Sequence, residues 1–252
     1  METAAMPPNT PFNQRFAAPL PLADEEVAAL LHMKMGSRTF RRGQEIVSEG
    51  RRCYTIFLIT EGIAIRYRIV RDGQRQILNF LLPGDFAGLT SCFFESALYS
   101  IKALTPTVIS AIPFATVIEL LDTNPGLAAR LFRLFASEAA IRAEHLIGIG
   151  TLPGLERVAH FLLELLTRLR AKGLADERSY RLPLTREIIG DALGMSVRNV
   201  NRVLQQLRAA GLVRIEDQVV VIENIEELSD LADFERGYLR PLSIDELVGE
   251  RG

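Results

Sequence analysis

The sequence predicts an α+β protein, in which a small antiparallel β-sandwich or barrel precedes a helical half. Three observations lead to this fold class. Between residues 37 and 113, short β-rich runs alternate with glycines spaced 7 to 12 residues apart. Helical periodicity begins at Phe114. Between residues 184 and 222, two helical segments meet at a glycine and a β-hairpin follows them. Many short strands with regular turns are typical of a closed antiparallel structure.

The composition is that of an ordinary globular protein, with 252 residues of which 48% are hydrophobic and 24% charged. No apolar run reaches the length of about 18 residues that a membrane span needs. The N-terminal segment lacks a basic stretch before an apolar core, so we expect no secretory signal and a cytoplasmic location. The only cysteines are Cys53 and Cys92. This count excludes a disulfide framework and any zinc or iron–sulfur site with four cysteine ligands.

The formal net charge of −2 conceals an uneven distribution along the chain. Residues 1–152 carry 15 basic and 14 acidic side chains, a net charge of +1. Residues 153–215 carry 11 and 6, a net charge of +5, and residues 216–252 carry 3 and 11, a net charge of −8. A basic segment followed by an acidic tail directs the search for nucleic-acid contacts to residues 153–215.

In the first half of the chain, turn residues separate the expected elements. Residues 1–21 are rich in proline and have no clear period, which predicts a loose arm, and residues 24–35 have helical spacing. Asp72 and Gly73 lie between two alternating runs, as in a tight hairpin. The expected strands cover residues 46–47, 54–59, 63–70, 76–82 and 107–112.

A long helical region is expected over residues 114–149, with a kink or break at Pro125 and Gly126. Two adjacent stripes run along it, which suits a helix that packs on its own domain with one face and on another helix with the other. A buried amphipathic helix without a partner would show a similar pattern, and this alternative stays open. On the first interpretation, the residues expected at a dimer contact are Leu127, Leu131, Leu134, Phe135, Glu138, Ile141, Arg142 and His145.

A helix-turn-helix motif is expected within residues 184–212. Thr185 can cap a first helix of two turns, and Gly194 follows that helix where a left-handed residue is needed. Ser196 can cap a second helix over residues 197–209, which has an apolar inner stripe and a polar outer face. The second helix is therefore the candidate recognition helix.

The elements around this motif complete a winged domain. An amphipathic helix is expected at residues 156–170, after a break at residues 152–154, and strands are expected at residues 212–215 and 218–222. A recognition helix presents its N-terminal turns to base edges, where arginine can bind guanine and asparagine can bind adenine. The side chains expected to read bases are Val197, Arg198, Asn199, Asn201 and Arg202. The side chains expected to contact phosphates are Thr185, Arg186, Ser196, Gln206 and Arg208.

From about Phe40 to Ile222 the chain resembles the CRP/FNR family of bacterial transcription regulators. The resemblance rests on FRRGQEIVSEG and YTIFLITEGIAIRYRIVRDGQRQILNFLLPGDFAGL, on ERVAHFLLELL, and on LTREIIGDALGMSVRNVNRVLQQLRAAGLV. It implies a homodimer with a jelly-roll-like sensory β-roll, a long dimerisation helix and a C-terminal winged helix-turn-helix. The implied boundaries are a flexible arm at 1–21, the β-roll at 22–113, the connecting helix at 114–152, the DNA-binding domain at 153–222 and an acidic extension at 223–252.

The family's functional positions carry over unevenly. Its base-reading arginine falls on Arg202, but Arg198 stands where the family commonly has a glutamate, so the family's usual half-sites are in doubt. In cyclic-nucleotide-binding members a glycine–glutamate pair binds the ribose, whereas Leu89 follows the glycine in this chain. The family's phosphate-binding arginine–serine pair aligns near residues 97–98, which are alanine and leucine. A buried phosphate without a cation is costly, so cyclic AMP is not expected as the effector. The residues expected around an effector pocket are Gly84, Phe86, Gly88, Leu89, Leu98 and Tyr99.

No resident cofactor is expected. The family's oxygen sensors use clustered cysteines near the N-terminus, and no cysteine precedes Cys53, so an iron–sulfur cluster of that kind is not expected. Haem is also not expected, although three histidines could offer an axial ligand, namely His32, His145 and His160. Cys53 and Cys92 are expected to be inert buried thiols, but the two arginines before Cys53 leave a thiol switch open.

The leading hypothesis is a homodimeric, sequence-specific DNA-binding regulator of transcription that reads a pseudo-palindromic operator. Its expected partners are double-stranded DNA and a second copy of the chain, with RNA polymerase left open and no membrane. The β-roll either senses a signal or is constitutively active. The alternative is a ligand-sensing protein-interaction module with a vestigial DNA-binding surface. An enzyme is not expected, because the sequence offers no metal-ligand cluster, no Ser/His/Asp arrangement and no phosphate loop.

Overall fold

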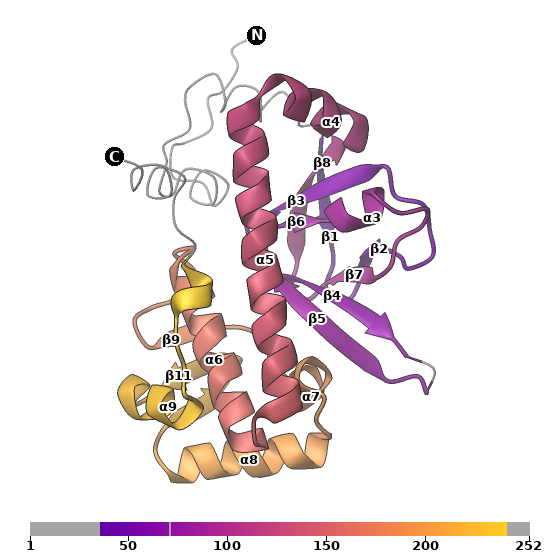
Figure 1. The fold of residues 1–252 in the computed structure, drawn as a ribbon. Coiled ribbons are helices and arrows are strands. Elements are labelled where there is room, and N and C mark those ends of the chain that lie inside the picture. The colour runs from indigo at the N-terminus through magenta and orange to yellow at the C-terminus, as the bar shows by residue number, and fades with distance from the viewer. Residues whose placement is uncertain (1–35, 71, 241–252) are drawn as a thin grey trace, which may run out of the picture. The chain divides into compact units, whose positions relative to one another are not determined.

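A computed structural model of the chain describes residues 36–70 and 72–240 (Figure 1). The chain divides into two compact units. The described part of the first unit comprises residues up to Arg66 and residues 80–134. The second comprises residues 67–79, apart from residue 71, and the chain from Phe135 to residue 240. The arm expected at residues 1–21 and the helix expected at residues 24–35 lie outside the described residues.

Two four-stranded sheets make up the β-roll. The first has the order β1 (Ser37–Phe40), β8 (Thr107–Pro113), β3 (Thr55–Glu61) and β6 (Phe86–Ala87). The second has the order β2 (Glu45–Val47), β7 (Ser100–Ala103), β4 (Ala64–Ile69) and β5 (Arg75–Leu81). β3 and β8 pair antiparallel from Thr55 opposite Pro113, with a register shift after Ile59. The non-consecutive strand orders show that the sheets are built by long-range pairing.

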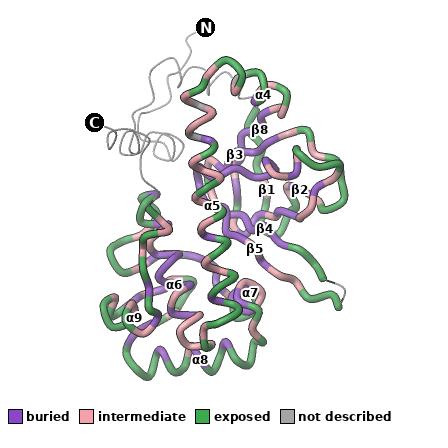
Figure 2. The backbone as a smooth tube through the Cα atoms, in the orientation of Figure 1, coloured by how far each residue is buried: buried purple, intermediate pink, exposed green. Residues whose placement is uncertain are grey.

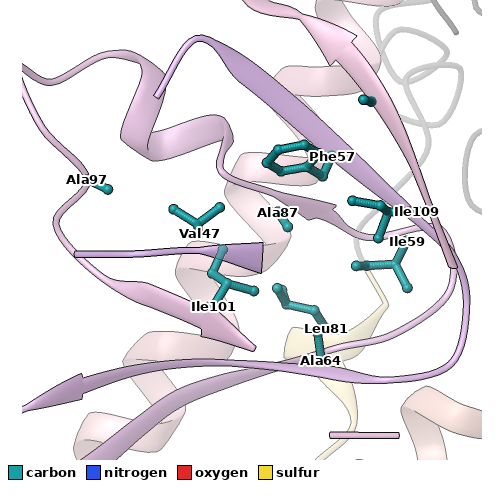
Figure 3. Packing of buried hydrophobic residues seen from close by; sticks show 10 residues of the cluster. Val47, Phe57, Ile59, Ala64, Leu81, Ala87, Ala97, Ile101 and Ile109 are labelled. Carbon is teal, nitrogen blue, oxygen red and sulfur yellow. The ribbon is translucent and has the colours of Figure 1, made fainter. Parts of the chain in front are cut away.

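An apolar core fills the interior of the roll. Side chains alternate across a strand, so Phe57 and Ile59 of β3 point to the same face and meet Ile109 of β8. Figure 3 shows this cluster with Leu81 of β5 and Ile101 of β7, contributed by the second sheet. The fully buried members are aliphatic or aromatic, so the hydrophobic effect holds the two sheets together.

Helices follow the roll. α3 (Leu89–Cys92) is a single turn after β6, and α4 (Phe114–Thr123) follows β8. α5 begins at Pro125 and runs for 27 residues to Thr151. The break expected at Pro125 and Gly126 is therefore confirmed: proline opens a new helix, because its fixed φ suits the first helical position and its missing N–H is not needed there. Across residues 36–70 and 72–240, no helix has the length and apolar character that crossing a membrane requires.

The second unit holds a small helical core with a three-stranded sheet. Its elements after α5 are α6 (Gly154–Arg170), β9 (Ser179–Arg181), α7 (Arg186–Leu193), α8 (Val197–Ala209), β10 (Val213–Glu216), β11 (Val219–Ile222), α9 (Ile225–Ala232) and the 3₁₀ turn η1 (Gly237–Leu239). α6 is the central helix, packed against α8 and α9. Leu162 and Leu165 of α6 are completely buried, as is Val200 of α8. The sheet has the order β10-β11-β9.

The predicted α+β class is confirmed, and the differences lie in short or late elements. The strands β1, β6, β7 and β9 were not expected, because each has at most four residues and is defined by a partner strand distant in sequence. The acidic extension was expected only as a charged tail, but it forms α9 and η1. Asn224 caps α9 by accepting a hydrogen bond from the Glu227 N–H at 3.2 Å.

Candidate nucleic-acid interface

α7 and α8 begin at the two residues expected to cap them. Thr185 Oγ1 accepts from the Ile188 N–H at 3.3 Å, and Ser196 Oγ accepts from the Asn199 N–H at 3.3 Å. Each cap satisfies one backbone donor that the helix itself leaves without a partner. Gly194 ends α7 in the left-handed region, with φ of 64°. The local sequence thus determines both helix ends and the turn between them.

The turn brings the two helices very close together at Gly190. A Cβ atom on Gly190 would lie 2.5 Å from the backbone carbonyl oxygen of Met195. The Met195 N–H in turn donates to the Gly190 carbonyl at 2.9 Å. Only glycine allows α7 and the turn to approach this closely, and the approach fixes the angle at which α8 leaves the turn.

α8 separates its residues cleanly by burial (Figure 2). Its inner stripe is Val200, Val203 and Leu207, each at most 1% exposed. All the residues expected to read bases are exposed, namely Val197, Arg198, Asn199, Asn201 and Arg202. These side chains occupy the first two turns of α8, the part that a recognition helix presents to base edges.

The two arginines of this face are available to a ligand. Within the part of the chain that the structure describes, neither Arg198 nor Arg202 has an ion pair. Arg186, at the start of α7, donates through Nε to Oδ1 of Asn201 at 3.2 Å. This hydrogen bond connects the N-terminal ends of α7 and α8 through the Asn201 carbonyl oxygen, so it does not use the Nδ2 donors of that side chain.

The residues expected to contact phosphates fall into two groups. Thr185, Arg186 and Ser196 lie at the N-terminal ends of α7 and α8, where backbone N–H groups favour an anion. Gln206 and Arg208 lie exposed in the last turn of α8. Arg208 is also within 3.4 Å of Glu216 on β10, a weak surface ion pair.

The hairpin of β10 and β11 forms the expected wing. β10 ends at Glu216, and the tight turn consists of Asp217 and Gln218 rather than Glu216 and Asp217. Both turn residues have positive φ, 48° and 65°, as a two-residue hairpin of matching twist requires. Arg181 Nη1 donates to the Asp217 carbonyl at 3.0 Å, so a side chain of β9 holds the turn of the wing.

The eight residues expected at a dimer contact do not share one environment in the single chain. Leu131, Glu138 and Ile141 are buried, with 6%, 7% and 6% exposure. Leu134, Phe135 and His145 are half-buried, Arg142 is exposed, and the side chain of Leu127 lies outside the described part. Among the α5 side chains that the structure describes, the large apolar ones left exposed are Phe132, Leu146, Ile147 and Ile149.

The residues expected around an effector pocket lie on β6, α3 and the segments beside them. Gly84, Phe86, Gly88 and Leu89 are buried, and Leu98 and Tyr99 are half-buried. Leu89, which follows Gly88 at the start of α3, is only 6% exposed. Residues 97 and 98 are alanine and leucine, and neither side chain can donate a hydrogen bond to a phosphate.

A buried ionic cluster in the second unit was not foreseen from the sequence. Glu164 of α6 is fully buried and accepts from Arg168 Nη1 at 3.2 Å, from Tyr238 Oη at 3.2 Å and from His145 Nε2 at 2.7 Å. Burial raises the pKa of Glu164, but the hydrogen bond and charge of His145, together with Arg168, outweigh it and bring the pKa down to about 2. Tyr238 belongs to η1, so the C-terminal extension completes this cluster.

Arg157 is a second residue that the sequence did not single out. From α6, its Nη1 donates to the Leu193 carbonyl at 3.0 Å and its Nη2 to the Leu152 carbonyl at 2.8 Å. These carbonyls lie at the end of α7 and just after α5, where helical partners are lacking. One guanidinium therefore ties the helix-turn-helix to the end of the long helix. A lone arginine in an amphipathic helix gives no sequence signal for this role.

Known proteins share both halves of this architecture. Residues 37–124 match the cyclic nucleotide-binding domain family, and residues 156–231 match the Crp-like helix-turn-helix domain family. The transcriptional activator protein anr of Pseudomonas aeruginosa is 30% identical over 214 residues, which cover 85% of this chain and 87% of that protein. The chain belongs to the CRP/FNR family of transcription regulators.

Further relatives support the assignment of this regulator to the CRP/FNR family. The fumarate and nitrate reduction regulatory protein of Escherichia coli K12 is 27% identical over 218 residues, covering 86% of this chain and 87% of that protein. The structure of FixK2 from Bradyrhizobium japonicum superposes with a TM-score of 0.71 and 29% identity, covering 78% of this chain and 96% of that one. The prediction of a CRP/FNR transcription regulator with a helix-turn-helix DNA-binding domain is confirmed.

The described part of the regulator contains no set of side chains suited to bind a metal ion. Residues 36–70 and 72–240 contain no group of three or more His, Cys, Asp or Glu side chains that could hold a metal ion. His145 is engaged by Glu164, and the ring of His160 contacts those of Phe234 and Tyr238, at centroid distances of 4.9 and 6.0 Å. His32 lies outside the described residues.

Proposed function

We propose that this regulator acts in the cytoplasm as a homodimer and reads a pseudo-palindromic operator with α8 of each copy in the major groove. The observation that carries this proposal is the exposed polar face on the first two turns of α8, opposite a buried apolar stripe. Two such helices would meet half-sites whose centres are about 34 Å apart, one helical turn of DNA.

Base reading is assigned to the exposed residues of that face. Arg202 and Arg198 each offer the two-pronged donor that matches guanine, and Asn199 and Asn201 each offer the amide that matches adenine. Val197, 41% exposed, can contact a thymine methyl group. Because an arginine replaces the family's usual glutamate at position 198, the operator is expected to differ from the family's usual half-sites.

Phosphate contacts would fix the register of α8 in the groove. We assign them to the capped ends of α7 and α8, through Thr185, Arg186 and Ser196, and to Gln206 and Arg208 in the last turn of α8. The net charge of +5 over residues 153–215 supports this assignment, since an operator is polyanionic.

The dimer contact is assigned to the exposed face of α5. Leu131, Glu138 and Ile141 are already buried in the single chain, so we keep Phe135 and Arg142 of the expected set and extend the proposed surface along the stripe to which these two belong. This stripe comprises Phe132, Phe135, Ala139, Arg142, Leu146 and Ile149, spaced at three and four residues. Phe132 is 77% exposed and Leu146 73%, and large exposed apolar side chains on one helix face are typical of a protein contact.

We further propose that the β-roll uses neither cyclic AMP nor a resident metal cofactor. Two cysteines in the whole chain are too few for a four-cysteine cluster, and the buried Leu89 supports the loss of the ribose contact. Any effector would contact the largely apolar surface around Phe86 and Tyr99. In titration calorimetry, cyclic AMP is expected to give no saturable heat, and a saturating isotherm would overturn this part of the proposal.

Selection of bound duplexes from a random pool tests the function as a whole. The full-length protein is expected to enrich one palindromic sequence, with and without a metabolite extract if it is constitutively active, and only with extract if it is gated by a ligand. Binding that shows no enriched sequence, and that disappears at moderate salt, would instead support a vestigial DNA surface.

A further inference from the structure

The two cysteines of the chain face each other in the first unit. Cys53 lies in the segment before β3, and Cys92 is the last residue of α3. Their Sγ atoms are 3.8 Å apart, with the Cys92 thiol donating toward Cys53. Both residues are half-buried rather than fully buried, contrary to the expectation of inert buried thiols. A small reagent can therefore reach the pair.

The backbone of the roll builds this juxtaposition. β6 pairs with β3 through Ala87 opposite Phe57, which brings the start of α3 onto β3. Gly88 caps α3 with φ of 81°, and a Cβ atom there would lie 3.2 Å from the Thr55 carbonyl oxygen and 3.4 Å from Cys53 Sγ. The lack of a side chain at Gly88 thus leaves space for the two thiols to lie next to each other. The Cys92 N–H donates to the Gly88 carbonyl at 3.1 Å and holds the second thiol on this turn.

The two thiols differ in acidity. The hydrogen bond from Cys92 lowers the pKa of Cys53 to about 6, although burial opposes this shift. The pKa of Cys92 is raised, because its hydrogen bond to Cys53 and its burial both favour the neutral thiol. The two shifts favour Cys53 as the sulfur that carries the negative charge when the pair loses its first proton. The thiolate is the form that attacks an oxidant.

We propose that Cys53 and Cys92 form a reversible intramolecular disulfide when the protein meets a hydroperoxide. The Cys53 thiolate attacks the peroxide oxygen, which breaks the O–O bond and gives a sulfenic acid, while the leaving oxygen departs with a proton as water or an alcohol. The Cys92 sulfur then attacks the sulfenic sulfur and displaces the second oxygen as water, with its own proton. Two electrons pass from the two thiols to one peroxide. A dithiol reductant reverses the step by exchange.

Closing this bond brings together two sulfurs that already lie next to each other. The sulfurs must approach from 3.8 Å to about 2.05 Å, the length of a disulfide bond. The bond would join the start of β3 to the end of α3. Phe93, next to Cys92, packs edge-on against Phe114 with ring centroids 4.9 Å apart, and the Phe114 N–H donates to the Tyr54 carbonyl at 2.9 Å. The residues that follow both cysteines therefore contact the first residue of α4.

Intact-protein mass spectrometry and thiol titration test the proposal on the full chain without DNA, so the result is independent of the proposed operator binding. The reduced protein is treated with one equivalent of hydrogen peroxide per chain. We expect a loss of mass equal to two hydrogen atoms, the loss of both titratable thiols and a peptide that links Cys53 to Cys92. Dithiothreitol should restore both thiols. Added oxygen without cross-linking, a disulfide between chains, or two unreacted thiols would overturn the proposal.

Single variants identify the attacking sulfur. Cys92→Ser leaves Cys53 without its resolving partner, so a sulfenic acid at Cys53 is expected to accumulate and to be trapped by dimedone. Cys53→Ser leaves only Cys92, whose burial still favours the neutral thiol, so we expect it to react with peroxide about 10-fold more slowly than Cys53 does in Cys92→Ser. Equal reactivity of the two variants would overturn the assignment of Cys53. If a variant fails to fold, the wild-type protein tests the same assignment. The rate at which iodoacetamide alkylates its first thiol should rise with pH through about 6, the pKa of Cys53. A rate that rises only near the usual thiol pKa would overturn the assignment.

Discussion

His145 Nε2 lies 2.7 Å from Oε2 of Glu164, and this contact joins α5 to α6 across the turn at Leu152 and Pro153. A carboxylate can only accept, so Nε2 of His145 carries the proton. With Arg168 and Tyr238 as its other donors, Glu164 is a buried anion whose hydrogen-bonding partners come from α5, α6 and η1. The long helix, the DNA-binding domain and the C-terminal extension thus share one buried charge.

Replacing this anion should destabilise the protein strongly. Glu164→Gln removes the negative charge that compensates Arg168. It also places an amide N–H donor where the surrounding side chains are themselves donors. We expect the free energy of unfolding of the second unit to fall by about 3–5 kcal/mol, the range for breaking a buried ion pair from one side. Urea unfolding of the variant and of Glu177→Gln, a matched change at an exposed position, measures the effect. A loss as small as that of the control would show that the cluster contributes nothing.

The same cluster predicts a dependence of stability on pH. The folded-state pKa of Glu164, about 2, lies below the value of 4.5 for the free side chain. Its contribution to stability is therefore complete above about pH 4.5 and is lost as the pH falls from 4.5 toward 2. The difference in unfolding free energy between wild type and Glu164→Gln should shrink over this interval. A difference that stays constant from pH 7 to about 2 would contradict the assignment.

Local signals and long-range contacts explain how far the sequence could predict this structure. The bounds of α7 and α8 were predicted to the residue, because Thr185, Gly194 and Ser196 determine them through their own caps and turn. The cluster around Glu164 could not be predicted, since Tyr238 reaches it from 74 residues away. The Cys53–Cys92 pair likewise depends on β3–β6 pairing, and β6 has only two residues.

The residues expected at a dimer contact on α5 were drawn from both of its stripes for a related reason. Periodicity identifies stripes, but burial by the rest of the chain decides which stripe stays available. Leu131 and Leu146 are both leucines at helical spacing, yet they are 6% and 73% exposed. No feature of the helix's own sequence separates them. The two stripes could be told apart only after the chain had folded around one of them.

Gly190 should be intolerant of even one methyl group. Gly190→Ala would place Cβ 2.5 Å from the Met195 carbonyl oxygen, so α7 or the turn must shift. We expect a loss of about 1–3 kcal/mol in unfolding free energy, as for other overpacked sites. Gly150→Ala is the matched control, because that glycine is also helical but has nothing within 4 Å of its Cβ position. The control should gain up to about 1 kcal/mol from helix propensity. Equal changes in both variants would contradict the close approach.

A charge on the exposed face of α5 should separate the proposed dimer. Leu146→Glu would bury a carboxylate without a partner in an apolar contact, which costs several kcal/mol. Sedimentation velocity of the variant is expected to show a monomer at concentrations where the wild type is a dimer. Leu174→Glu, at a position 40% exposed and outside α5, should leave the dimer intact. A Leu146→Glu protein that sediments as the wild type does would remove this face from the proposal.

Arg202 should determine one base pair of each half-site. Arg202→Ala removes a two-pronged contact to guanine, so the preference for that base pair is expected to weaken by about 1–3 kcal/mol, while the other positions keep theirs. Fluorescence anisotropy with the selected duplex and its single-base variants measures this preference. Arg170→Ala removes the same charge from the end of α6, outside the helix-turn-helix, and should lower affinity for every duplex equally or not at all. Because the two variants carry the same net charge, a preference lost only in Arg202→Ala reports base contact rather than general attraction to phosphate. Unchanged discrimination in Arg202→Ala would assign base reading to another residue of α8.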